Sequence, residues 1–184
     1  MRRHPQRQLR IRMLSLALLR HAKSSWEASH LDDFDRPLNA RGRAAAPIMG
    51  ETLRSFPFVP EIILCSPAKR TRETLHLIEP SFGHPHGHVL FEDQLYLTSA
   101  DTLLERLRHV SATAKTVLMI GHNPGLHELA LMLTGRGDAK SISRLEDKFP
   151  TAALAILTFP ETAWRDVGPS SGRLEGFITP RDRS

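Results

Sequence analysis

Short apolar runs recur along the chain and predict buried strands. Four of them are apolar at odd and even positions alike, which is typical of strands covered on both faces of a sheet. These four runs cover residues 14–19, 61–65, 116–120 and 153–157. Val89 to Phe91 form a shorter strand candidate, and two weaker candidates lie near Trp164 and Phe177.

Amphipathic segments lie between these runs and predict helices. We expect helices over 40–55, 68–78 and 100–114, and a fourth that starts at 123–125 and ends at Gly135. Asn39 is a good N-cap for the first helix, and Pro47 inside it is expected to kink or restart it. The alternation of strands and helices predicts an α/β fold, a three-layer α/β/α sandwich around a mainly parallel sheet.

The length of 184 residues favours one domain, which we place at 14–184. The net charge is +5, but residues 1–13 hold five arginines and no acid, so 20 basic and 20 acidic side chains remain in the body. We expect residues 1–13 to be a basic, disordered tail; a natural start at Met13 and an organellar presequence are the alternatives. Because the body is balanced in charge, composition does not support nucleic-acid binding.

Two further features bear on the compartment. No apolar run approaches the ~18 residues that span a bilayer, so a membrane partner is not expected. Cys65 is the single cysteine, which excludes an intrachain disulfide. A reducing, cytoplasmic location is therefore expected.

Charged and imidazole side chains follow three of the predicted strands. Arg20 and His21 end the first strand, Arg70 lies just after the second, and His122 follows the strand at 116–120. Because the carboxyl ends of parallel strands meet at one edge of a sheet, we expect these groups to converge there. Arginine forks match phosphate oxygens, and a neutral histidine with one free ring nitrogen can attack phosphorus. Such a site needs no metal ion or other cofactor, since its own cations neutralise the phosphoryl group.

The runs that carry these residues resemble the histidine phosphatase superfamily, the phosphoglycerate-mutase-like proteins. The similar runs are 18–24, 65–74 and 120–123. The closer similarity is to SixA-type phosphohistidine phosphatases, in Arg20-His21-Ala22-Lys23-Ser24, in Asp35-Arg36-Pro37-Leu38 and in Lys148-Phe149-Pro150-Thr151-Ala152. The resemblance covers about residues 14–180 and implies the phosphoglycerate-mutase-like fold.

The resemblance also implies roles for individual residues. His21 would be the nucleophile that forms a phosphohistidine intermediate. Arg20, Arg70 and His122 would form the phosphate pocket, and Ser24 falls where many relatives have a hydroxyl group. The implied activity is metal-independent hydrolysis of phosphohistidine on a phosphoprotein. A phosphatase for a small phosphorylated ester and a non-catalytic phosphate- or phosphoprotein-binding module are the alternatives.

The general acid is not identified by any motif. Glu92, Asp93 and Asp101 lie near the segment where many relatives supply a glutamate, but none of them matches a clear pattern. An imidazole, with a reference pKa of ~6.5, leaves far more easily than an alkoxide. We therefore hypothesise that a site without a firm acid favours phosphoramidates over ordinary phosphate esters.

Other chemistries fit the sequence less well. A cysteine phosphatase loop places five residues between its cysteine and arginine, whereas four separate Cys65 from Arg70, so Cys65 is predicted to be a buried strand residue. His84, His86 and His88 alternate with Pro85 and Gly87, which indicates a surface turn rather than a metal site. Trp26 is left with two interpretations, packing over the mouth of the site or anchoring a loop.

Overall fold

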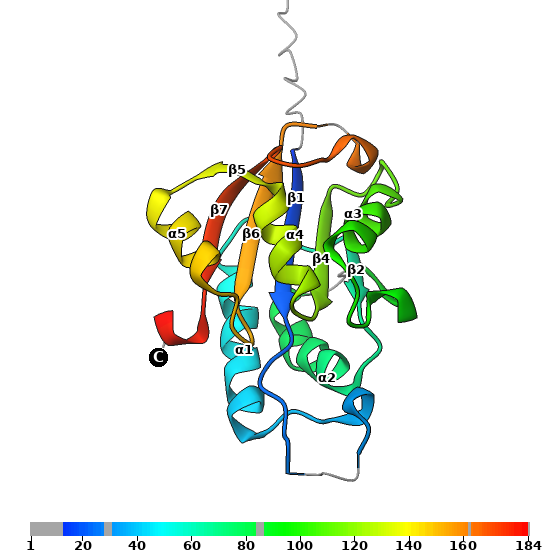
Figure 1. Cartoon of the computed structure of the whole chain (residues 1–184), viewed down its shortest axis with the longest axis vertical. Helices are drawn as coiled ribbons and strands as arrows, with labels where there is room; N and C mark the ends of the chain where they lie inside the picture. Colours follow the sequence, from blue (N-terminus) through cyan, green and yellow to red (C-terminus); the bar gives the residue numbers. More distant parts are fainter. Residues whose placement is uncertain (1–12, 28–30, 84–86, 162, 184) are drawn as a thin grey trace, which may run out of the picture.

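One seven-stranded sheet runs through the protein (Figure 1). The computed structural model describes residues 13–27, 31–83, 87–161 and 163–183. The strand order is β3-β2-β4-β1-β6-β7-β5. The strands are β1 (Leu14–Arg20), β2 (Ile62–Cys65), β3 (His88–Phe91), β4 (Thr116–Gly121), β5 (Thr134–Gly137), β6 (Leu154–Phe159) and β7 (Gly172–Ile178).

The sheet is mainly parallel, as the sequence predicts. β1 pairs in parallel with β4, β4 with β2, β2 with β3, and β5 with β7. β6 lies antiparallel to both of its neighbours, β1 and β7. The carboxyl ends of β1, β2 and β4 therefore open at the same edge of the sheet, the place where α/β proteins build their sites.

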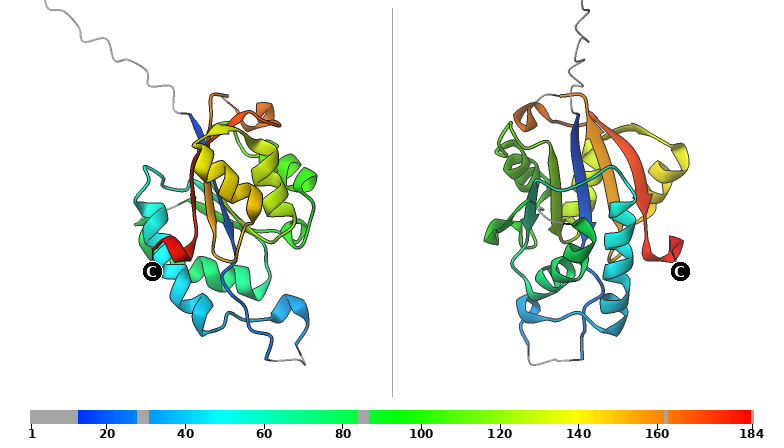
Figure 2. Two further views of the ribbon diagram at one scale, coloured as in Figure 1. Left: turned by 60° about the vertical axis from the view of Figure 1, so that its left-hand side comes forward. Right: turned by 180° about the vertical axis from the view of Figure 1, so that it is seen from behind.

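Helices cover both faces of the sheet, which confirms the three-layer α/β/α arrangement (Figure 2). α1 (Ala40–Arg54) and α2 (Lys69–Ile78) pack on one face, and α3 (Ala100–Arg108), α4 (Gly125–Leu133) and α5 (Ala139–Asp147) pack on the other. Along β1, Leu16 and Leu18 face the second group, whereas Ala17 and Leu19 face the first. β1 thus buries alternate side chains in two separate cores.

The start of α1 fixes the loop that leaves β1. The Asn39 side chain caps this helix by accepting a hydrogen bond from the Gly42 amide at 2.9 Å, and the Asn39 amide donates to the Lys23 carbonyl at 3.0 Å. A Cβ atom at position 42 would lie 2.1 Å from that carbonyl, so only glycine permits this close approach. α1 continues through Pro47 as one helix, so of the expected kink or restart at this proline the restart does not occur.

Several elements differ from the sequence-based prediction. Trp164 lies in a 3-10 helix (Trp164–Asp166) rather than a strand, and its fully buried indole donates to the Ala114 carbonyl at 2.7 Å. α3 ends at Arg108 instead of continuing to Ala114. The sequence patterns did not reveal β5 or α5, which follow α4 directly.

Some predictions fall on parts of the chain that the structure does not describe. The tail assigned to residues 1–13 lies outside the described residues except for Met13, and so do His84 and His86 of the predicted turn. Within the described ranges, no helix is long and apolar enough to cross a membrane.

Candidate active site

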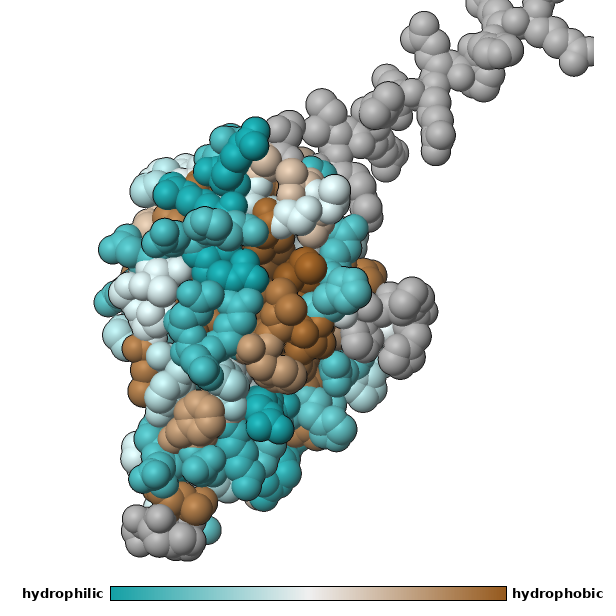
Figure 3. Space-filling model, turned by 90° about the vertical axis from the view of Figure 1, so that its right-hand side faces the viewer, coloured by the Kyte–Doolittle hydropathy of each residue, from teal (hydrophilic) through white to brown (hydrophobic). Residues whose placement is uncertain are grey.

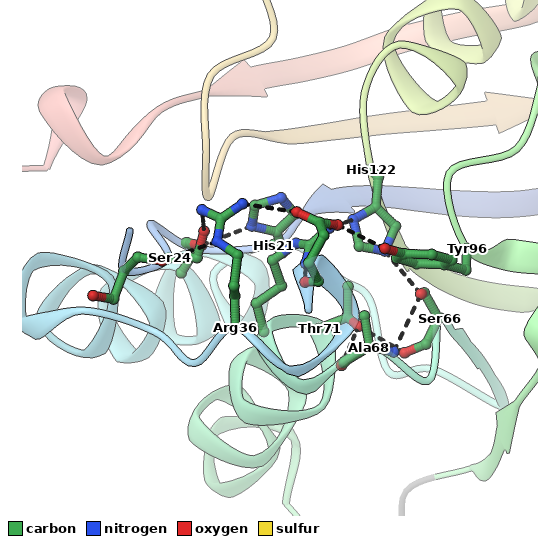
Figure 4. Close-up of polar contacts among 12 residues, drawn as sticks. His21, Ser24, Arg36, Ser66, Ala68, Thr71, Tyr96 and His122 are labelled. Atoms are coloured by element: carbon green, nitrogen blue, oxygen red, sulfur yellow. Dashed lines mark hydrogen bonds and ion pairs between the residues drawn. The ribbon is translucent and has the colours of Figure 1, made fainter. Parts of the chain in front are cut away.

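The five site residues predicted from the sequence line one cavity of about 370 Å³ at the carboxyl ends of β1 and β4. Arg20 ends β1, His21 follows it, and Ser24 lies in the loop beyond. Arg70 comes from the first turn of α2, and His122 directly follows β4 (Figure 4). The cavity is also lined by Lys23, Trp26, Asp33, Arg36, Leu97, Asn123 and Thr151.

His21 is held with one ring nitrogen free. Its Nδ1 lies 2.8 Å from the Ala22 carbonyl oxygen and donates its hydrogen there, which leaves the lone pair on Nε2. The Ala22 amide in turn donates to Thr74 Oγ1 at 3.0 Å, so α2 fixes the peptide that orients the ring. Burial, reinforced by Arg70 and Arg20, lowers the pKa of His21 to about 3. At neutral pH His21 is therefore an uncharged imidazole with an available nucleophilic nitrogen.

His122 is held in the opposite tautomer. Arg70 Nη2 donates to His122 Nδ1 at 3.3 Å, so Nε2 carries the hydrogen and donates to Ser66 Oγ at 2.8 Å. Burial, then His21 and Arg70, lower the pKa of His122 to about 3. The ring centroids of His21 and His122 are 5.2 Å apart. A neutral His122 supplies shape and hydrogen bonding, and the positive charge of the cavity comes from other side chains.

Three arginines and Lys23 line the cavity as cations, and Arg36 among them had no assigned role in the sequence analysis. Arg20 donates to the Phe149 carbonyl at 2.9 Å, while its buried Nε has no hydrogen-bond partner among the described residues. Arg36 is the additional member and is 7% exposed. It donates to Ser24 Oγ and to Asp33 Oδ1, both at 2.8 Å. Ser24 thus both lines the cavity and holds the Arg36 guanidinium.

Asp33 bridges Arg36 and Arg70. Its carboxylate accepts from Arg36 at 2.8 Å, from Arg70 at 2.9 Å and from the Tyr96 hydroxyl at 2.6 Å. Partial burial would raise the pKa of Asp33, but the hydrogen bonds from Tyr96, Arg36 and Arg70 outweigh it and lower the pKa to about 2. Of the described side chains that line the cavity, Asp33 alone is a carboxylate. It is ionised at neutral pH and has no proton to give.

The three acidic residues considered as general acids do not line the cavity. Glu92 is committed elsewhere, since both of its carboxylate oxygens accept from Arg106 at 2.7 Å. That hydrogen bonding lowers the pKa of Glu92, which disfavours its acid form. Cys65 is fully buried in β2, as predicted, and burial raises the pKa of its thiol. A thiolate nucleophile at this site is therefore not supported.

The arrangement can bind and transfer a phosphoryl group. The arginines offer fixed donors to the phosphoryl oxygens, and His21 offers a neutral nitrogen nucleophile beside them. Sequence reasoning missed Asp33, Arg36 and Tyr96 because only the fold brings the segments around 33 and 96 to the carboxyl ends of β1 and β4. A local signal for Arg36 was present in the run Asp35-Arg36-Pro37-Leu38, which is similar to SixA-type proteins, but no role was assigned to its buried arginine.

Comparisons with known proteins agree with this geometry. The family model of the histidine phosphatase superfamily (branch 1) matches residues 16–93. An uncharacterized protein of Mycobacterium leprae is 34% identical over 167 residues, covering 89% of this chain and 100% of its own length. An uncharacterized chloroplastic protein of Arabidopsis thaliana is 34% identical over 177 residues, covering 90% of this chain and 77% of its own.

Solved structures have a similar fold over most of the chain. A structure assigned as the phosphohistidine phosphatase SixA of Nakamurella multipartitia superposes with a TM-score of 0.79 at 28% identity, covering 91% of this chain and 96% of that one. One assigned to SixA of Agrobacterium tumefaciens gives 0.74 at 29% identity, covering 91% and 98%.

Proposed function

Because this chain belongs to the histidine phosphatase superfamily, we propose that it hydrolyses phosphohistidine carried by a phosphoprotein, through a phosphohistidine intermediate on His21 and without a metal ion. The observation that carries the proposal is a neutral His21, with Nε2 free, inside a cavity lined by Arg20, Arg36 and Arg70. The SixA-type structures that this chain resembles support the substrate class.

In the first step, His21 Nε2 attacks the phosphorus and the phosphorus–nitrogen bond of the substrate breaks. The arginines hold the phosphoryl oxygens as charge moves in the transition state. The Ala22 carbonyl accepts from Nδ1 and stabilises the positive charge that develops on the His21 ring. In the second step, water attacks the phosphorus of phospho-His21. Orthophosphate leaves with both protons of that water, and His21 returns to its neutral form.

The leaving group distinguishes phosphohistidine from an ordinary ester. A phosphorylated imidazole carries a proton on its second nitrogen, so it departs as neutral imidazole without help from an acid. An alkoxide needs a proton from the enzyme. Because Asp33 is the one carboxylate among the described cavity residues and is ionised, the site is better suited to phosphohistidine.

The test measures orthophosphate release, with a chelator present, from a histidine-phosphorylated protein and from p-nitrophenyl phosphate. Wild type is compared with His21→Ala, and brief acid-free quenching checks for phosphate bound covalently to the enzyme. We expect wild type to dephosphorylate the protein and His21→Ala to be at least ~10³-fold slower. Turnover of the aryl phosphate alone would favour the small-molecule alternative. Tight phosphate binding without release from either compound would favour the non-catalytic module.

A further inference from the structure

The mouth of the cavity differs in character from its charged floor. Trp26 and Leu97 line the same cavity as His21, yet they are 74% and 52% exposed. Single exposed apolar residues are common on protein surfaces, but here two of them line the same polar cavity and place apolar surface beside its charged groups. Catalysis by the arginines and histidines does not use either residue.

Leu97 has a backbone conformation that a leucine normally avoids. Its φ angle is +46°, in the left-handed region. The preceding residue, Tyr96, holds this segment to the site, because its hydroxyl donates to Asp33 at 2.6 Å and its ring packs edge-on against His122 at 5.4 Å between centroids. Strain of this kind persists where the surrounding contacts impose it, and it concentrates at functional sites. Here the strained residue lines the cavity with an apolar side chain.

Trp26 presents an open aromatic surface. The Arg36 guanidinium lies 3.2 Å from the centroid of its ring and so occupies one face. With 74% of the residue exposed, the remaining ring surface is available to a ligand. Indole faces bind planar rings by stacking, in particular rings that carry partial positive charge. A protonated phosphoimidazole is such a ring.

We propose that Trp26 and Leu97 form a subsite for the leaving group and select substrates whose phosphoryl group is attached to a planar aromatic ring. The inference deepens the proposed function and depends on it. A cavity of about 370 Å³ lies at the small end of ligand sites, which suits a phosphoryl group and one ring. The imidazole of phosphohistidine and the phenyl ring of an aryl phosphate share this chemistry, and the experiment separates them.

The test compares compounds with and without an aromatic ring on the group that leaves phosphorus. Phosphohistidine is compared with phosphoramidate, which has a phosphorus–nitrogen bond but no ring, and phenyl phosphate is compared with methyl phosphate. The variants are Trp26→Ala, Trp26→Phe and Leu97→Gly, of which the last keeps the left-handed backbone without strain. Phe91→Ala is the matched control. Phe91, the last residue of the edge strand β3, is 51% exposed and lines a separate hollow of about 830 Å³. Figure 3 shows an apolar band on the side of the molecule that lies at the right in Figure 1.

We expect Trp26→Ala and Leu97→Gly to raise KM for phosphohistidine about 3- to 10-fold, with little change in kcat, because stacking is made equally in the ground and transition states. Trp26→Phe should retain most of the affinity. Phosphoramidate should show less than a twofold change, and Phe91→Ala should match wild type on every compound. If only phosphohistidine responds, the subsite is selective for imidazole; if phenyl phosphate also responds, it accepts aromatic rings in general.

Two results would overturn the subsite. Equal losses on phosphohistidine and phosphoramidate would mean that Trp26 acts only by positioning Arg36. Unchanged KM for both ring compounds in Trp26→Ala and Leu97→Gly would mean that neither residue touches the leaving group. A wild-type protein that is inactive on all four compounds would instead overturn the proposed function, and the subsite with it.

Discussion

Asp33 competes with the substrate for the cations that bind phosphate, and removing its charge should tighten phosphate binding. Its carboxylate holds Arg36 at 2.8 Å and Arg70 at 2.9 Å, so a phosphoryl group must share or displace these bonds. A dianion placed beside the same guanidinium groups is also repelled by the carboxylate. The substitution Asp33→Asn keeps the shape of the side chain and removes the charge.

The size of the effect follows from distance and exposure. Two unit charges 4 Å apart interact by ~4 kcal/mol at an effective dielectric constant of 20 and by ~1 kcal/mol in bulk water. Because the Asp33 side chain is 44% exposed, we take a value near the lower limit, about 1–1.5 kcal/mol. Orthophosphate should therefore bind Asp33→Asn roughly tenfold more tightly than wild type.

Isothermal titration calorimetry with orthophosphate at pH 7 measures this difference directly. Asp35→Asn is the matched control, since Asp35 carries the same charge two residues away and does not line the cavity. The difference should shrink at high salt. Unchanged or weaker binding to Asp33→Asn would refute the reasoning and show that the carboxylate mainly orients the arginines. If Asp35→Asn also bound orthophosphate more tightly by the same factor, the effect would come from the net charge of the protein rather than from the position of Asp33.

Three further predictions concern the site and its surroundings. Since the pKa values of His21 and His122 are lowered to about 3, the unfolded chain binds more protons than the folded protein below pH ~6.5. The free energy of unfolding should fall by up to ~2.7 kcal/mol for each unit of decrease in pH. Urea unfolding at pH 7, 6 and 5 measures this fall, which should be smaller in His122→Asn than in wild type. Ser66→Ala removes the partner of His122 Nε2 and should lower kcat/KM about fivefold in steady-state assays, at ~1 kcal/mol per hydrogen bond; no change would show that this bond does not orient the ring. Glu92→Gln should leave kcat for phosphohistidine within twofold of wild type, and it should lower stability by up to ~1 kcal/mol because the ion pair with Arg106 is weakened. A large loss of turnover would instead identify Glu92 as the general acid.

The sequence predicts well those elements that are buried and consist of apolar residues. β1 and β4 are buried on both faces, and their boundaries agree with the apolar runs to within one residue. β5 (Thr134–Gly137) has no apolar residue at all and pairs only with β7, so no local pattern marks it as a strand. Trp164 was misplaced for the opposite reason. Its apolar character indicated burial correctly, but a 3-10 helix over the edge of the core buries it as completely as a strand would.

The site residues also differ in whether the sequence pattern could place them. Residues at the ends of predicted strands could be grouped from the sequence because the topology of parallel sheets places such ends together. Arg36 and Asp33 belong to a segment without regular secondary structure apart from the short 3-10 helix Asp33–Asp35, and only contacts distant in sequence bring them to Arg70. No periodicity predicts such a contact. The loop also determines which cations remain available to phosphate, so it matters more for affinity than its local sequence indicates.

The register between β1 and β4 explains why two histidines 101 residues apart lie side by side. Arg20 lies opposite Gly121 in the parallel ladder, so His21 and His122 are the residues that directly follow two adjacent strands. Adjacent strands are about 4.8 Å apart, which matches the 5.2 Å between the ring centroids. A slip of one residue would turn one ring to the opposite face of the sheet. The alternate apolar residues of β1 and β4 prevent that slip, because it would also exchange the contents of the two cores. The packing that stabilises the fold and the pairing that brings the imidazoles together are therefore the same constraint, which is why a hydrophobic pattern could locate a chemical site.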